Sequence, residues 1–134
     1  MSLPDGIGAR ARLHHVSLAV TDLGRARDFY EGVLGLRPAA RPDFDFAGAW
    51  YDLGGAQLHL IVHPTARALR GSRAPDSRDA HFALRVPSYA AALARLAAAA
   101  WPCLEKPRSR TGWRQIFLTD PDGNVIELNA EASD

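Results

Sequence analysis

The feature that most constrains this chain is a strand pattern that occurs twice. Residues 13–20 (LHHVSLAV) alternate apolar side chains with polar or small ones, and residues 81–86 (HFALRV) do so again, as half-buried strands do. His15 and His81 lie 66 positions apart, and His59 and Glu127 lie 68 apart. Corresponding strands of two copies therefore carry polar side chains at corresponding places, which predicts a doubled module.

The first copy has a predicted helix after its first strand. Thr21 and Asp22 supply an N-cap, apolar residues then recur at helical spacing, and Gly35 suits the position just beyond the helix. Further strands of this copy are expected at 36–40, 47–53 and 56–62.

The second copy repeats this order. Pro87 and Ser88 open a predicted helix, and strands are expected at 81–86, 113–119 and 124–129. We interpret Asp120-Pro121-Asp122-Gly123 as a hairpin turn with a purely structural role. The whole pattern predicts a single domain with its boundaries at 9–134, module 1 at about 12–64, a linker at about 65–79 and module 2 at about 80–130.

Composition narrows the class of protein. The net charge of +1 gives no reason to expect a nucleic-acid or membrane partner. Cys103 is the only cysteine, which excludes an internal disulfide and a thiolate metal cluster. The first dozen residues lack the apolar core of a signal peptide. We therefore expect a cytoplasmic protein whose partner is a small-molecule substrate.

Four of the predicted strands carry polar residues on one face. These four faces could line a common cavity. Their residues are His15, Ser17 and Ala19; Gln57, His59 and Ile61; His81, Ala83 and Arg85; and Val125, Glu127 and Asn129. Three imidazoles and one carboxylate suit one divalent metal ion, namely Fe, Mn, Ni, Co or Zn. His14 falls on the opposite, apolar face and is expected to be structural.

Two long motifs carry a resemblance to a known family. The segments LHHVSLAVTDLGRARDFYEGVLGL (13–36) and IFLTDPDGNVIELN (116–129) resemble the opening and closing signatures of the vicinal oxygen chelate superfamily, which includes glyoxalases, bleomycin resistance proteins and extradiol dioxygenases. The resemblance implies an α+β fold, in which two tandem βαβββ modules form a curved mixed sheet that encloses a metal and substrate cup, often in a homodimer.

The resemblance also assigns metal ligands. It maps them to His15, His59, His81 and Glu127. Where the glyoxalase I pattern commonly has a second Glu, this chain has His59, which argues against lactoylglutathione lyase activity. Glu127 is the expected catalytic residue, because a carboxylate can move a proton while the metal stabilises developing charge.

Three functions remain open at this point. The leading one is a metal-dependent, glyoxalase-like lyase or isomerase acting on a small oxygenated metabolite. An Fe(II) extradiol-type dioxygenase and a metal-free, bleomycin-resistance-like ligand-binding protein are the alternatives. Arg85 and Gln57 share the faces of the expected ligands and are candidate substrate contacts. The pattern fits a site formed within one chain as well as one formed across a dimer.

Overall fold

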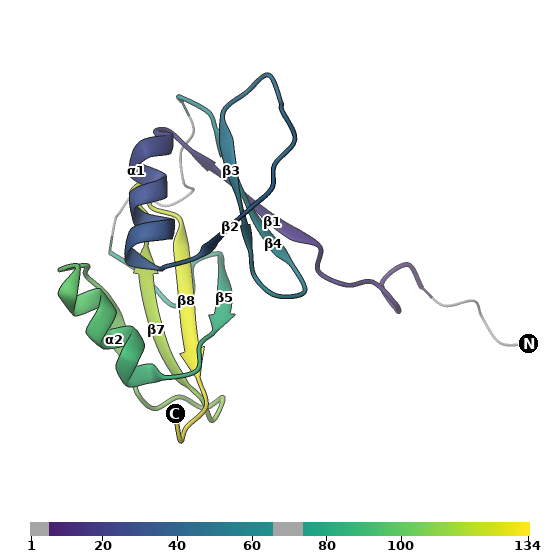
Figure 1. Cartoon of the computed structure of the whole chain (residues 1–134). Coiled ribbons are helices and arrows are strands. Elements are labelled where there is room, and N and C mark those ends of the chain that lie inside the picture. Colours follow the sequence, from purple (N-terminus) through teal and green to yellow (C-terminus); the bar gives the residue numbers. More distant parts are fainter. Residues whose placement is uncertain (1–5, 66–73) are drawn as a thin grey trace, which may run out of the picture.

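A computed structural model describes residues 6–65 and 74–134, so residues 66–73 of the expected linker lie outside the described residues. Within these ranges the strands form two four-stranded sheets, ordered β1-β4-β3-β2 and β5-β8-β7-β6 (Figure 1). In each sheet the first and last strands of the module pair in parallel, and the other neighbours are antiparallel. The α+β class and the two tandem modules are therefore confirmed.

The elements follow the same order in both modules. The first module consists of β1 (His15–Val20), α1 (Leu23–Arg27), a π-helical segment (Asp28–Val33), β2 (Arg37–Ala39), β3 (Gly48–Asp52) and β4 (Gln57–Val62). The second consists of β5 (His81–Arg85), α2 (Tyr89–Ala98), β6 (Leu104–Lys106), β7 (Arg114–Thr119) and β8 (Val125–Ala130). Three-residue β6 was not expected, because so short a strand shows no alternation.

Side-chain caps start both helices where the sequence predicts. The Asp22 carboxylate accepts a hydrogen bond from the Arg25 backbone N–H over 2.9 Å, and the Ser88 hydroxyl accepts one from Ala91 over 3.1 Å. Each cap satisfies a backbone donor that the first helical turn leaves unpaired. Gly35 follows the first helix with φ +70°, a conformation that glycine adopts without steric cost.

Helix α1 contacts β3 of the first sheet and α2 contacts β8 of the second, and side chains of both modules form one core (Figure 1). The Phe29 ring lies 4.8 Å from the Trp101 ring, between centroids, and Arg95 Nε donates to the Val33 carbonyl over 2.8 Å. Within the described residues, no helix is long and apolar enough to cross a membrane. Because the helices take up the apolar faces of the sheets, the opposite faces carry the polar side chains.

The Asp-Pro-Asp-Gly turn, interpreted as a structural hairpin, also ties the two modules together. Buried Asp120 accepts a hydrogen bond from the Tyr30 hydroxyl over 2.7 Å. Asp122 accepts two from Thr21, at 2.6 Å from the hydroxyl and 3.0 Å from the backbone N–H. The turn of the second module thereby holds the start and the middle of the first module's helical region.

Candidate functional site

The first pair of expected ligands, His15 and His59, lies on neighbouring strands β1 and β4. The parallel register sets Ser17 opposite His59, so His15 and His59 share one face of the sheet. Their rings stack with centroids 4.2 Å apart. His15 is exposed, whereas His59 is buried.

Burial shapes the chemistry of His59. Desolvation, followed by the neighbouring charges of His15, His14 and Arg41, lowers the pKa of His59 below its ordinary value of 6.5. This shift favours the neutral form of the imidazole, which is the form that binds a metal. Its Nε2 lies 2.9 Å from Oε1 of Gln57, so this candidate substrate residue contacts a candidate ligand directly.

His14 does not take the packing position expected for it. It is exposed, and its Nδ1 lies 2.8 Å from Nδ1 of His15, with the two rings nearly perpendicular. Strand β1 begins only at His15, so the alternation that placed His14 on the apolar face does not extend back to it.

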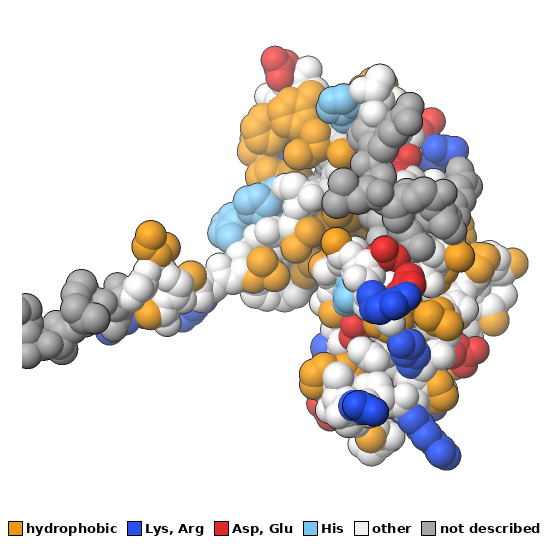
Figure 2. Space-filling view, turned by 180° about the vertical axis from the view of Figure 1, so that it is seen from behind, with side chains coloured by type: hydrophobic (Ala, Val, Ile, Leu, Met, Phe, Trp, Pro, Cys, Tyr) orange, Lys and Arg blue, Asp and Glu red, His pale blue; other side chains and the backbone are white. Residues whose placement is uncertain are grey.

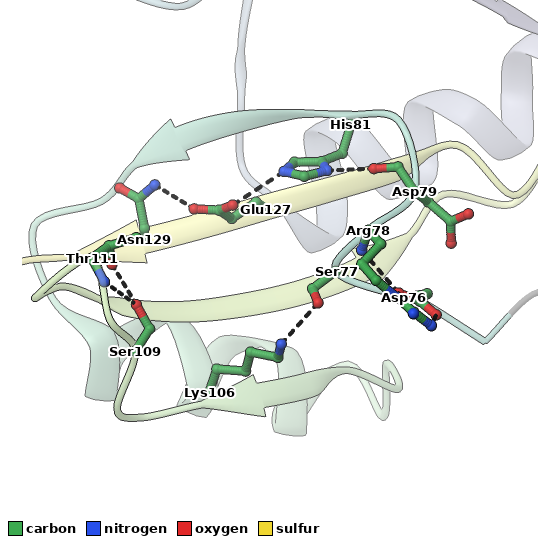
Figure 3. A network of polar contacts seen from close by, with 10 residues as sticks. All are labelled: Asp76, Ser77, Arg78, Asp79, His81, Lys106, Ser109, Thr111, Glu127 and Asn129. Atoms are coloured by element: carbon green, nitrogen blue, oxygen red, sulfur yellow. Dashed lines mark hydrogen bonds and ion pairs between the residues drawn. The ribbon is translucent and has the colours of Figure 1, made fainter.

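The second pair, His81 and Glu127, lies on β5 and β8. The parallel register sets Ala83 opposite Glu127, and Nε2 of His81 lies 3.2 Å from Oε1 of Glu127. Nδ1 of His81 lies 2.6 Å from the Asp79 carbonyl oxygen (Figure 3). If Nδ1 carries the ring proton, that contact is a hydrogen bond and Nε2 is left free to bind a metal.

Asn129 fixes the carboxylate of Glu127 from the other side. Its amide Nδ2 donates to Oε2 of Glu127 over 2.6 Å, and both side chains are buried (Figure 3). Arg85 Nε donates to Oδ1 of Asn129 over 2.7 Å, and its Nη1 forms an ion pair with Glu131. Arg85, expected as a substrate contact, thus supports the candidate ligand through Asn129.

The two pairs do not meet within one chain. Among residues 6–65 and 74–134, no group of three or more His, Cys, Asp and Glu side chains is placed to hold one metal ion. Each sheet instead presents two donors of the expected set on its open face. The expected ligands therefore form two separate pairs, one on each sheet.

Sequence reasoning missed the roles of Asn129 and Asp120. Asn129 stands two residues after Glu127 in β8, so strand alternation already put both on one face, but nothing in the sequence identified it as a support for the carboxylate. Asp120 looked like a turn residue. Burial raises its pKa, and hydrogen bonds from Asn124, Tyr30 and the Asp122 backbone oppose that rise.

Comparisons with known proteins agree with this architecture. The family model of the Glyoxalase/Bleomycin resistance protein/Dioxygenase superfamily matches residues 12–128. The chain is 31% identical to the lactoylglutathione lyase of Salmonella typhimurium over 128 residues, which is 92% of this chain and 94% of that protein.

Solved structures show the same fold. A glyoxalase/dioxygenase from Nostoc punctiforme superposes with a TM-score of 0.76 at 22% identity, covering 98% of both chains. TnmS3, an antibiotic binding protein from Streptomyces sp. CB03234, superposes with a TM-score of 0.70 at 27% identity, covering 92% of this chain and 98% of that one. Both an enzyme and a ligand-binding protein are thus among the similar proteins.

Proposed function

Because the chain belongs to the Glyoxalase/Bleomycin resistance protein/Dioxygenase superfamily, we propose that it is a metal-dependent lyase or isomerase acting on a small oxygenated metabolite. The proposed ligands of one divalent metal ion are His15, His59, His81 and Glu127. The observation that carries this proposal is the support around the second pair. His81 and Glu127 are each held by a further polar group, Asp79 and Asn129 respectively.

That support is typical of metal ligands. A ligating imidazole commonly donates its other N–H to a carbonyl or carboxylate, and a ligating carboxylate is itself hydrogen-bonded. The Nδ1 contact of His81 and the Oε2 contact of Glu127 have this form. The nitrogen and oxygen donors fit Fe, Mn, Ni, Co or Zn.

We propose that the site is completed by a second copy of the chain. His15 and His59 of one protomer would meet His81 and Glu127 of the partner subunit, and the two-fold axis would generate a second, identical site. The separation of the pairs within one chain supports this arrangement. The exposure of His15 also supports it, because an open face is available to be covered.

The residues divide the chemistry among them. A bound divalent metal supplies Lewis-acid polarisation of a substrate oxygen. Glu127 would take the proton from the carbon next to that oxygen and return it to the neighbouring carbon, while Asn129 holds Oε2. His59 is itself a proposed metal ligand and stands where the glyoxalase I pattern commonly has a second carboxylate, so we assign the proton transfer to Glu127. We therefore expect a substrate other than that of a lactoylglutathione lyase.

A complementation experiment tests both the ligands and the shared site. His15→Ala and Glu127→Ala are prepared separately and each is expected to lose metal. Mixed by unfolding and refolding together, they form heterodimers with one intact site, which restores metal to about one quarter of the sites when pairing is random. Metal in either single variant at the parental level contradicts the ligand assignment. Loss in both without recovery contradicts the shared site.

A second function is favoured by one observation. TnmS3 is an antibiotic binding protein, and its identity to this chain is 27% over nearly its whole length. A parent protein that is free of metal after purification, and that takes up no Fe, Mn, Ni, Co or Zn, would support ligand binding without metal chemistry.

A further inference from the structure

An aromatic strip runs across the open face of the first sheet. We use this name for Phe44, Phe46, Trp50 and His59, whose rings follow one another. The centroid of Phe46 lies 5.1 Å from that of Phe44, Phe44 lies 6.1 Å from Trp50, and Trp50 lies 4.0 Å from His59. The strip therefore ends at a proposed metal ligand.

Strand register fixes the strip on that face. Trp50 of β3 lies opposite His59 of β4 in the antiparallel pair, so both side chains project from the same side of the sheet. Their rings are nearly parallel, at 6°. Ile61, two residues beyond His59, adds exposed apolar surface on the same side. Figure 2 shows hydrophobic side chains gathered beside histidines on this part of the molecule.

The two phenylalanines of the strip are exposed, whereas other aromatic rings are buried. Phe44 and Phe46 are each 42% exposed, whereas Phe29, Tyr30 and Tyr51 are at most 1% exposed. Adjacent apolar rings that are exposed to solvent indicate a surface that binds a ligand or a partner. Stacked aromatic faces favour a flat π system over a saturated group of equal size.

The strip is also held in place by a neighbouring cation. The Arg41 guanidinium lies 4.9 Å from the Phe44 centroid and 5.2 Å from the Phe46 centroid, and it donates to the Phe46 carbonyl over 2.8 Å. It therefore fixes the loop. Asp43 and Asp45 alternate with the two phenylalanines and are exposed, so acidic side chains as well as Arg41 flank the strip.

From this geometry we propose that the aromatic strip makes the site specific for a planar aromatic compound. This assignment rests on the proposed function, since it names the ligand class of the same site. The ring would stack along Phe44, Phe46 and Trp50 while its oxygen substituents reach the His59 end.

The test compares two probes that differ in aromaticity. 2,3-Dihydroxynaphthalene is flat, and its fully saturated counterpart, cis-decahydronaphthalene-2,3-diol, keeps the vicinal oxygens but no π face. Calorimetric titration of the parent is expected to show at least tenfold tighter binding of the aromatic probe. The double variant Phe44→Leu, Phe46→Leu, which keeps apolar bulk, is expected to lose that preference. Ile7→Ala, which removes a fully exposed apolar side chain elsewhere, is the control and should keep it.

Other results would overturn the proposal. A parent without preference for the aromatic probe, or a double variant that retains it, shows that the strip does not select a ligand. A double variant that turns monomeric in sedimentation while the parent is dimeric shows that the strip is a contact between copies. Metal content of the same samples separates the two proposals. If the protein prefers the aromatic probe but takes up no metal, the proposed role of the strip holds and the proposed metal-dependent function fails. If it binds metal but shows no preference, the metal site holds and the proposed role of the strip fails.

Discussion

The Asn129 amide and the Glu127 carboxylate form a 2.6 Å hydrogen bond inside β8, between side chains two residues apart on one face. This contact occupies Oε2 of Glu127 and leaves Oε1 facing His81. Both Asn129 and Glu127 are buried, so water replaces the amide poorly if it is lost. The orientation of the proposed base and ligand therefore depends on Asn129.

Replacing Asn129 with Leu is expected to weaken metal binding by about 10–100-fold, the range seen when a group that orients a ligand is removed. Competition with a coloured chelator measures the affinity. Asn129→Gln keeps an amide and is expected to recover part of it. Equal metal affinity in Asn129→Leu and the parent, with both proteins folded by circular dichroism, would remove Asn129 from the site.

Asp120 is expected to stabilise the fold more at low pH than at high pH, which is the opposite of the usual effect of a carboxyl group. Burial raises the pKa of Asp120 above its ordinary 3.8, so the folded chain holds this proton more tightly than the unfolded chain does. The contribution of Asp120 to the free energy of unfolding is therefore largest below 3.8 and declines as pH rises through the folded pKa.

Urea denaturation of the parent and of Asp120→Asn across the acid range measures this contribution. The free energy of unfolding of the parent, relative to that of the variant, is expected to fall as pH rises. The altered hydrogen bonds to Tyr30 and Asn124 destabilise the variant by an amount that does not change with pH. A difference that grows with pH would mean that those hydrogen bonds outweigh desolvation.

Gly48 is required by close packing at the start of β3. A Cβ at this position would lie 2.3 Å from the Leu60 carbonyl oxygen in the neighbouring strand, closer than atoms can approach. Gly48→Ala is therefore expected to lower the free energy of unfolding by about 2–3 kcal/mol, as strained insertions into packed regions do. Gly55→Ala, where a Cβ meets nothing within 4 Å, is the matched control. Equal urea midpoints for the two variants would show that β3 shifts freely.

Much of the fold was predictable because it depends on local patterns. Alternation identified the strands that carry the expected ligands, and Asp22, Ser88 and Gly35 marked helix ends by side-chain and backbone chemistry that acts within a few residues. The local patterns did not predict contacts between distant parts of the chain. The hydrogen bond between Tyr30 and Asp120 joins residues 90 positions apart, and no periodicity signals such a pair.

The sequence predicted which strand faces carry the expected ligands, but it did not predict how those faces are arranged in the fold. Alternation put His15 and His59 on polar faces, and likewise His81 and Glu127, but it does not specify which sheet faces which. That relation depends on how the helices of the two modules pack, and Phe29 and Trp101 meet in that shared core. Support for a ligand by Asn129 depends in turn on side-chain rotamers, which spacing in the sequence does not determine.

The division of the donors between two sheets has a consequence for how the protein works at low abundance. When two chains must meet to complete each metal site, the fraction of working sites falls with dilution below the dissociation constant of the dimer, and metal binding in turn tightens the dimer. Total activity would then rise more steeply than in proportion to the amount of protein made, so a modest change in expression could act as a threshold.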